Sequence, residues 1–326
     1  MGKHRFRLRK FPGVSSPAKW MALIVMALFH SAVFKSFSES GKSSLMQMDQ
    51  VREGAFALRS GSDHLPGEIV MVNWNIARGV RQAEILQAFR GSLKADLYLL
   101  QEVDWETRRA GFRKVAEEMA RELGMNYLFG IEFRELAQER KRQPAFHGQA
   151  TFSRGAFTHS RVVRFRHQPY NWNPFWKPRL AKMQPREGGR MALVAEIQLD
   201  GRLCVFYNLH LESRTTDRSR AKQIREALDD IKARYPQETP VAFAGDLNTR
   251  LSAASPVLRE LEADGFQDVF QGQPGPLGTK VGAKSGLRKD WIFVRHLHFS
   301  DARVVKLTLS DHYPLIVRLA MPKADR

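Results

Sequence analysis

Polar side chains that could carry out chemistry flank several strand-like runs of this 326-residue sequence. They form six clusters of carboxylates, amides and imidazoles: Asn75, Gln101-Glu102, Asn208-Leu209-His210, Asp246-Leu247-Asn248, Asp290 and Ser310-Asp311-His312. Loops at strand ends are where catalytic groups are usually mounted on a rigid sheet. Taken singly, each cluster is as well explained by a structural histidine or an ordinary turn. Together they predict one polar site that several strands assemble.

The donor types in this set indicate a hard divalent cation. Carboxylate and amide oxygens favour Mg²⁺, Mn²⁺ or Ca²⁺ over zinc. The single cysteine, Cys204, lies in an apolar run, so we expect neither an intramolecular disulfide nor a thiolate metal site. A cation beside two histidines fits in-line attack of water on phosphorus, because the cation neutralises phosphate oxygens while the imidazoles move or orient protons.

The elements that must position these residues begin near residue 67. Short β-rich runs there alternate with amphipathic segments. We expect strands at 69–74, 97–100, 147–153, 160–166, 191–198, 203–211, 240–245, 291–294 and 315–319, and helices at 84–89, 112–123 and 218–233. This alternation indicates an α/β or α+β domain over residues 67–322.

The charge of the chain predicts an anionic partner. The formal net charge is +18, and residues 65–326 alone hold 42 Lys and Arg against 30 Asp and Glu, a charge of +12. Such a field attracts nucleic acid, anionic lipid headgroups or small phosphorylated molecules, and it does not distinguish among them. A basic surface that serves only solubility is the alternative.

The N-terminal region has the pattern of a targeting or anchoring segment. Residues 1–19 form a basic segment without an acid, and residues 20–37 form a mainly apolar one, the expected signal or anchor helix. The preceding positive charge predicts a cytoplasmic N-terminus and an exported body. We expect a cell-membrane protein with an exported catalytic domain, or a secreted or periplasmic protein if the segment is cleaved. Residues 38–66 are expected to be a linker.

Residues 161–190 form a basic segment with interspersed aromatic side chains. It holds eight Lys and Arg against the single acid Glu187, together with four prolines. Aromatics interleaved with cations can stack on bases or enter a lipid interface. The alternative is a surface loop whose aromatics pack back on the domain.

The clusters occur in an order that resembles the endonuclease/exonuclease/phosphatase superfamily. The six blocks that carry this resemblance are Trp74-Asn75-Ile76, Gln101-Glu102-Val103-Asp104, Asn208-Leu209-His210-Leu211, Gly245-Asp246-Leu247-Asn248, Asp290-Trp291-Ile292 and Ser310-Asp311-His312-Tyr313-Pro314-Leu315. They extend over nearly the whole expected domain. The resemblance implies a four-layer α/β/β/α sandwich of two packed mixed β-sheets, with the site at one end of the sheets.

The resemblance also implies a metal site that takes Mg²⁺ or Mn²⁺. Glu102 resembles the principal metal ligand of the family, and Asn75 stands beside it. Asp311 resembles a residue that assists a metal. These three residues are therefore the expected metal site.

Five further residues take catalytic roles by the same resemblance. Asp246 and Asn248 resemble the pair that orients the attacking water and the scissile phosphate. His312 resembles the histidine that polarises water or phosphate, and Asp290 is expected to orient it. His210 resembles a second histidine, which acts on a phosphate oxygen or on the leaving group.

Candidate substrate contacts complete the expected site. Arg78, Arg154 and Asn208 are expected to bind the substrate phosphate, and Arg109 is a further candidate. Surface salt bridges are the alternative for the arginines. Gln149 stands where relatives often have Asn, so we assign no phosphate contact to it.

Departures from the family pattern indicate which branch of the superfamily the chain resembles. Ala77 stands where relatives that resemble abasic-site endonucleases carry an acid, and Val103-Asp104 replaces their lysine region. The run 146–154 and the Gln-Glu-Val-Asp block are more similar to the branch of sphingomyelinase-like and uncharacterised envelope hydrolases. The substrate expected from this branch is a lipid or headgroup phosphodiester.

These patterns predict a metal-dependent phosphoesterase, either a phosphodiesterase or a phosphatase. One alternative is a nuclease acting on DNA or RNA, which the basic body favours. A second alternative is a non-catalytic module of the same fold that binds a phosphate ligand. We expect the membrane as a partner through the N-terminal segment and no obligate protein partner.

Overall fold

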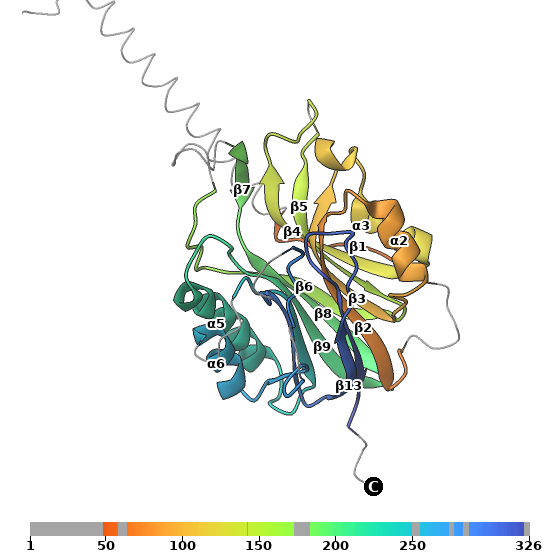
Figure 1. The fold of residues 1–326 in the computed structure, drawn as a ribbon, viewed down its shortest axis with the longest axis vertical. Coiled ribbons are helices and arrows are strands. Elements are labelled where there is room, and N and C mark those ends of the chain that lie inside the picture. Colours follow the sequence, from red (N-terminus) through yellow and green to blue (C-terminus); the bar gives the residue numbers. More distant parts are fainter. Residues whose placement is uncertain are drawn as a thin grey trace, which may run out of the picture. The chain divides into compact units, whose positions relative to one another are not determined.

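The computed structural model describes residues 48–57, 64–141, 143–172, 183–249, 255–273, 277–282 and 287–322. They belong to one compact unit that begins at Met48. Two mixed β-sheets pack face to face in this unit, with helices on both outer sides (Figure 1). The layered α/β/β/α architecture expected from the sequence is thereby confirmed.

The first sheet has eight strands and carries half of the candidate site. Its order is β1 (Arg52–Gly54), β4 (Asn126–Glu135), β5 (Phe146–Ser153), β3 (Leu97–Trp105), β2 (Glu68–Arg78), β14 (Leu315–Ala320) and β13 (His298–Val304), and β7 (Arg186–Gly188) pairs with β4 outside this path. The central strands β2 and β3 run parallel to each other. Their carboxyl ends therefore lie at the same edge of the sheet.

The second sheet has six strands and carries the other half. Its order is β11 (Gln267–Asp268), β12 (Asp290–Arg295), β10 (Val241–Asp246), β9 (Arg202–His210), β8 (Met191–Leu199) and β6 (Phe157–Arg164). Strand β9 is buried from Cys204 onward because it lies inside a sheet that is covered on both faces. Cys204 is a buried free thiol, as the apolar run around it predicts.

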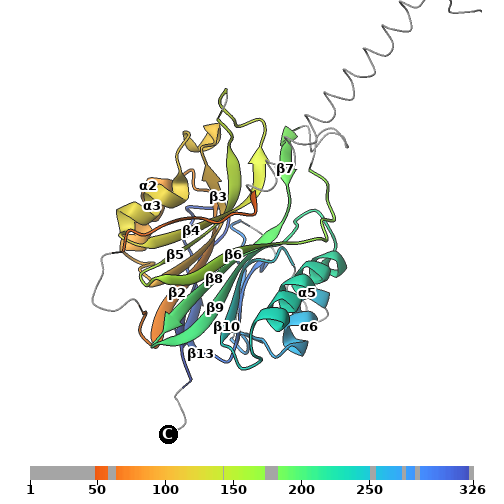
Figure 2. The same cartoon turned by 180° about the vertical axis from the view of Figure 1, so that it is seen from behind.

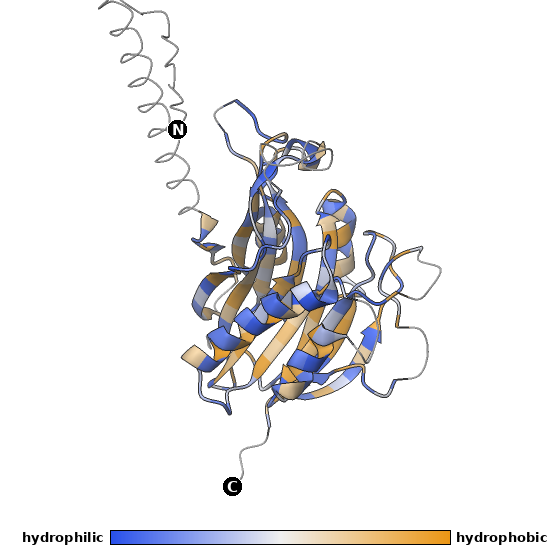
Figure 3. Ribbon diagram, turned by 90° about the vertical axis from the view of Figure 1, so that its left-hand side faces the viewer, coloured by the Kyte–Doolittle hydropathy of each residue, from blue (hydrophilic) through white to orange (hydrophobic). Residues whose placement is uncertain are grey.

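Helices close the two outer faces. Two helices pack on the first sheet, α2 (Gln82–Arg90) and α3 (Val115–Leu123), and the short η1 (Arg108–Ala110) precedes α3. Helices α5 (Asp217–Arg234) and α6 (Pro256–Ala263) cover the second sheet (Figure 2). The Thr216 hydroxyl begins α5 by accepting a hydrogen bond from the Ser219 amide. A separate apolar core fills the space between the sheets. Figure 3 shows mostly hydrophobic strands behind helices whose outward surfaces are mostly hydrophilic.

Part of the expected linker belongs to the folded unit. Met48 is buried in the core under the first sheet, and its carbonyl accepts a hydrogen bond from Arg164. Strand β1 pairs with β4. The expectation of a linker throughout residues 38–66 is therefore wrong for residues 48–57, because a short strand with a single apolar anchor gives little periodic signal.

The expected membrane segment lies outside the described residues. The basic segment 1–19 and the hydrophobic helix at 20–37 both precede the first described residue, Met48. Within the described ranges, no helix combines the length and the apolar character that crossing a bilayer requires.

Candidate active site

The ends of six strands bring the predicted polar residues together. Strands β9 and β10 are parallel, and their register sets Asp246 opposite His210. The antiparallel strand β12 begins at the same edge, where Asp290 pairs with Asp246. In the other sheet, Asn75 stands opposite Gln101, one residue before Glu102. The segment that leads into β14 adds His312, whose carbonyl accepts a hydrogen bond from the Trp74 indole.

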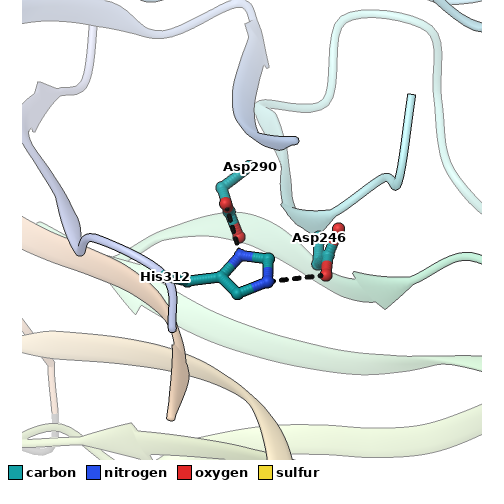
Figure 4. A group of neighbouring side chains, drawn as sticks. All are labelled: Asp246, Asp290 and His312. Carbon is teal, nitrogen blue, oxygen red and sulfur yellow. Dashed lines mark hydrogen bonds and ion pairs between the residues drawn. The ribbon is translucent and has the colours of Figure 1, made fainter. Parts of the chain in front are cut away.

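His312 is held between two carboxylates (Figure 4). Its Nδ1 lies 2.7 Å from Asp290 Oδ2, and its Nε2 lies 3.6 Å from Asp246 Oδ2. Burial alone would lower the pKa of His312, but the charges of Asp290 and Asp246 raise it to about 9. In the metal-free protein His312 is therefore a cation at neutral pH, oriented by Asp290.

Asp246 is the carboxylate that the other site residues share. Its Oδ1 accepts a hydrogen bond from the Asn248 amide, and its Oδ2 accepts one from Asn75. Burial raises the pKa of Asp246 to about 6, although the nearby His312 charge opposes the shift. A carboxylate with a pKa near the working pH is suited to accept a proton from water.

Glu102 and Asp246 face each other across one amide. Asn75 Nδ2 lies 3.2 Å from Glu102 Oε1 and 3.3 Å from Asp246 Oδ2. Burial would raise the pKa of Glu102, but the charges of His147 and Arg78 and the Asn75 hydrogen bond hold it below its usual value. The backbone of Glu102 has a left-handed φ of 51°, which is a strained conformation for glutamate.

Asn75 differs from the expected oxygen ligand. Its Oδ1 accepts a hydrogen bond from the Ala77 amide, so its nitrogen faces the two carboxylates. Asn75 therefore spaces Glu102 and Asp246 as a donor. That Asn75 contributes a ligand atom to the metal site stays a prediction.

His210 stands on the other side of Asp246 in a different ionisation state. Its Nε2 lies 3.7 Å from Asp246 Oδ2, and its Nδ1 lies 3.6 Å from Glu132 Oε2 without a hydrogen-bond partner. Burial, reinforced by the charge of Arg190, lowers the pKa of His210 well below its usual value. The site thus combines one protonated and one neutral imidazole on a single carboxylate.

Lysines and an arginine stand at the rim of the site. Lys289 donates a hydrogen bond to Asn248 Oδ1, whereas Lys280 forms an ion pair with Asp311. Arg78 Nε lies 4.0 Å from Glu102 Oε2, with its side chain 44% exposed. Arg78 therefore faces the site with room for a ligand, as expected. Asp311 is bound to Lys280 and more than half exposed, which leaves it a peripheral metal-site candidate.

The donor set fits a hard divalent cation. Ligand atoms of Asp246, Asp290 and His312 all lie within 4.8 Å of one another, and the buried Asp290 Oδ1 has no hydrogen-bond partner. Glu102 and Asp246 offer a second pair of carboxylate oxygens on either side of Asn75. Oxygen donors of this kind suit Mg²⁺ or Mn²⁺. Asp246 belongs to both groups.

Two predicted substrate contacts lie elsewhere. Arg154 donates a hydrogen bond to the Ala95 carbonyl and approaches Asp96, just before β3 begins, because β5 runs antiparallel to β3 and ends at the far edge. Asn208 is fully buried and is saturated by hydrogen bonds to Gln101, Leu100 and Ala150. The expectation that these residues bind the substrate is wrong. Asn208 instead joins the two sheets beneath the site.

Arg109 has a structural partner instead of a substrate. It forms hydrogen bonds of 2.6 and 2.8 Å with both Asp104 oxygens. The same carboxylate lies 2.7 Å from His147 Nδ1. Asp104 and His147 are thus a second carboxylate–imidazole pair, which sequence reasoning missed because the two residues meet only through the register of β3 and β5.

A cavity of about 340 Å³ lies at the site and is lined by the expected residues Glu102, His210, Asp246 and His312, among others. Besides the expected side chains, its walls include residues for which the sequence predicted no individual role in the site: His147, Gln184, Arg186, Arg190, Ser213, Arg214, Lys280 and Lys289. Trp172 also lines the cavity, and it belongs with Arg186 and Arg190 to the basic and aromatic segment 161–190 that the sequence indicated. A larger cavity, about 590 Å³, lies near Tyr235 and His296, away from the catalytic residues.

Comparison with known proteins agrees with this fold. The endonuclease/exonuclease/phosphatase family model matches residues 72–312, and the chain belongs to this family. No curated protein sequence matched the chain.

Solved structures share the fold at low sequence identity. An endonuclease/exonuclease/phosphatase from Beutenbergia cavernae DSM 12333 is 19% identical with a TM-score of 0.60, covering 79% of this chain and 72% of that one. The human Nocturnin catalytic domain is 17% identical with a TM-score of 0.58, covering 84% and 97%. A humanized D. rerio TDP2 is 19% identical with a TM-score of 0.53, covering 78% and 100%.

Proposed function

We propose that this protein is a divalent-metal-dependent phosphoesterase that hydrolyses its substrate by in-line attack of water. The observation that carries the proposal is the pair of imidazoles on Asp246. His312 lies 3.6 Å and His210 3.7 Å from the same carboxylate oxygen. A protonated and a neutral imidazole beside one carboxylate can divide the tasks of stabilising phosphate charge and transferring protons.

Each residue has a defined part in this mechanism. Asp246 and Asn248 orient the attacking water, and Asp246 Oδ2 accepts its proton. The His312 imidazolium, fixed by Asp290, donates a hydrogen bond to a phosphate oxygen. His210 contacts the phosphate or the leaving group from the opposite side. A cation held by Glu102 and Asp246 would neutralise phosphate oxygens.

Hydrolysis of bis-p-nitrophenyl phosphate tests the proposal. The purified protein should release p-nitrophenol with Mg²⁺ or Mn²⁺, and EDTA should stop the reaction. His312→Ala should lose activity, whereas the exposed His298→Ala, at the start of β13, is the matched control. Activity that persists in His312→Ala and in EDTA would disprove both the site and the metal requirement.

Two substrate classes remain within the proposal. The positive charge of residues 65–326 favours a nuclease acting on DNA or RNA. The expected N-terminal segment and the aromatic residues of segment 161–190 favour a lipid headgroup phosphodiester. Plasmid nicking compared with sphingomyelin and phospholipid turnover separates them, and steep inhibition by salt indicates the polyanion.

A non-catalytic binding module is the second candidate. It would bind a phosphate ligand in the same cavity with metal present and never turn it over. The presence of Glu102, Asp246 and His312 at one site favours catalysis instead. Stoichiometric binding of a phosphoester without product after long incubation would support the module.

We also propose that the catalytic domain is exported and that the N-terminal segment holds it at the cell membrane or directs its secretion. The basic residues 1–19 followed by the apolar segment 20–37 support this location. Immunoblotting of membrane, periplasmic and cytoplasmic fractions tests it. Full-length protein in the membrane indicates an anchor, a shortened soluble form indicates cleavage, and full-length protein in the cytoplasm contradicts the proposal.

A further inference from the structure

One wall of the cavity is built from guanidinium groups around an indole. We call this group, Arg186, Arg190, Arg214 and Trp172, the arginine wall. Arg186 Cζ lies 4.4 Å and Arg214 Cζ 5.8 Å from the centre of the Trp172 ring. The Trp172 indole is itself fixed by a 3.0 Å hydrogen bond to Glu212. The ring therefore holds two cations near each other.

Two guanidinium groups of the arginine wall, those of Arg186 and Arg190, are held in place before any ligand binds. Strand β7 pairs with β4 and sets Arg186 opposite Glu135. Gly188 in β7 has a φ of 118°, and an added Cβ would lie 2.2 Å from the Glu132 carbonyl oxygen, so the two strands approach as closely as glycine allows. Arg190 forms ion pairs with Glu132 and Glu212. A site fixed in this way loses little conformational entropy on binding.

The wall has binding capacity that its own partners do not use. The Arg186 side chain is 6% exposed, and its Nε lies 3.4 Å from Glu135 Oε1 in an ion pair that does not have the geometry of a hydrogen bond. Burial lowers the pKa of Arg186 to about 10, although Glu135 opposes the shift. Arg214 is exposed and forms no ion pair with a carboxylate in the described ranges. Because Arg186 and Arg190 are already paired with glutamates, Arg214 is the guanidinium of the wall that is left to bind an anionic ligand.

The wall is distinct from the catalytic residues but contiguous with them. Glu132 connects the two, because it lies 3.2 Å from Arg190 and 3.6 Å from His210. His210 in turn contacts Asp246. An anion on the wall therefore lies beside the proposed position of the scissile phosphate.

The rest of the cavity limits the size and character of that ligand. Among the described residues that line it, Trp172 is the only large apolar side chain, and six Lys and Arg side chains stand against three carboxylates. Its volume of about 340 Å³ is at the lower end of ligand pockets. A polar, cationic space of this size suits a compact multiply charged group and excludes an acyl chain.

We propose that the arginine wall is a second anion subsite, and that the substrate carries a second phosphate next to the one that is hydrolysed. This inference rests on the proposed phosphoesterase function and specifies its substrate class. Arginine binds phosphate through paired charge-assisted hydrogen bonds, which makes the wall selective for a phosphate group. The second phosphate belongs either to a small compound with adjacent phosphates or to a nucleic-acid backbone.

Binding of methylenediphosphonate tests the subsite without turnover. This probe has two phosphonate groups joined by a carbon bridge that hydrolysis cannot cleave. In calorimetry with the full-length protein at fixed Mg²⁺, it should bind at least about 10-fold more tightly than orthophosphate. Arg214→Gln should reduce that preference by about 10-fold, because one charged contact is lost.

Controls make the result specific to the wall. Arg166→Gln is the matched variant, because Arg166 is 88% exposed and does not line the cavity. Arg186→Lys keeps the buried charge but removes the forked donor, and circular dichroism verifies its fold. The Arg186→Lys protein should lose more affinity for methylenediphosphonate than for orthophosphate. Equal affinity of the wild-type protein for the two probes, or a preference unchanged by Arg214→Gln, overturns the subsite.

The two sources of the second phosphate give different competition. The dinucleotide pdTpdT has its phosphates separated by a nucleoside. Displacement of the diphosphonate by pdTpdT, with affinity that depends on Arg214, assigns the second phosphate to a nucleic-acid backbone. If the diphosphonate stays bound in the presence of pdTpdT, the second phosphate belongs to a small compound with adjacent phosphates. Because binding is measured directly, a protein that fails to hydrolyse any phosphoester can still reveal the subsite, so the two proposals fail separately.

Discussion

Two histidines that line the cavity, His312 and His147, each pair with a buried carboxylate, with the same geometry and different surroundings. His312 Nδ1 lies 2.7 Å from Asp290, and His147 Nδ1 lies 2.7 Å from Asp104. Asp104 is also bound by Arg109 and Thr107, whereas Asp290 keeps one oxygen without a partner. Asp104 divides its charge between Arg109 and His147, whereas the Asp290 carboxylate has no arginine partner among the described residues. The other partners of the carboxylate therefore decide what a carboxylate–imidazole pair can do.

The largest expected difference between the pairs is in catalysis. His312→Gln should lower kcat for bis-p-nitrophenyl phosphate by about 10²–10⁴-fold, which is the usual contribution of a proton-transfer group. His147→Gln should lower it by less than about 10-fold, because Asp104 is already paired with Arg109. Steady-state kinetics on both variants measures the contrast. Equal losses would show that the two pairs share the chemistry.

The order should reverse for stability. Asp104→Asn should lower the free energy of unfolding by about 3–5 kcal/mol, because the guanidinium of Arg109 cannot lose its proton when its carboxylate is removed. Asp290→Asn should lower the free energy of unfolding by about 1–2 kcal/mol, since His312 can become neutral and keep a hydrogen bond to the amide. Urea denaturation of the metal-free proteins gives both values. A larger loss for Asp290→Asn would contradict this interpretation.

The two pairs should also lose their contributions to stability at opposite ends of the pH range. The pKa of His312 is raised to about 9 in the metal-free fold, so its stabilising contribution is complete below about pH 6.5 and is lost as the pH rises through 9. Burial would raise the pKa of Asp104, but Arg109 and His147 lower it, so its contribution is present above about pH 4 and is lost in acid. Wild-type stability minus that of His312→Gln should shrink between pH 7 and 10, as measured by thermal denaturation with EDTA. A difference that grows with pH would refute the assignment.

Arg154 belongs to neither pair and should have the smallest effect. Its guanidinium lies beside Ala95 and Asp96 at the far edge of the first sheet. Arg154→Gln should change KM by less than about 2-fold, as expected of a surface substitution. Arg78→Gln, at the rim of the cavity, is the matched comparison and should raise KM more. A large effect at Arg154 would mean that the substrate extends beyond the cavity.

The sequence predicted the fold and the centre of the site because both depend on local patterns. Each catalytic block adjoins a buried strand, and parallel strands bring their ends to one edge. Asp246, Asp290 and His312 could therefore be placed together from residue type and order alone. Strand β4 was not predicted, although its buried face carries Glu132, the residue that links His210 to Arg190.

The remaining errors concern direction and long-range contact. Arg154 follows β5 directly, but the antiparallel direction of that strand takes it away from the site. Asn208 lies on the same face of β9 as His210, but it stands deeper between the sheets, where Leu100 and Ala150 accept its hydrogen bonds. Arg186 reaches the cavity through the pairing of a three-residue strand with β4. Neither strand direction nor such a short pairing leaves a signal in the neighbouring residues.

The left-handed backbone at Glu102 implies that the chain gives up stability at the proposed metal site. A glutamate at φ 51° is strained by about 1–3 kcal/mol, and glycine adopts the same conformation freely. Glu102→Gly should therefore raise the melting temperature while it eliminates hydrolysis. A homologue that has lost its chemistry would be free to make this exchange, so the residue type at this one position distinguishes a working enzyme from a relative selected only to remain folded.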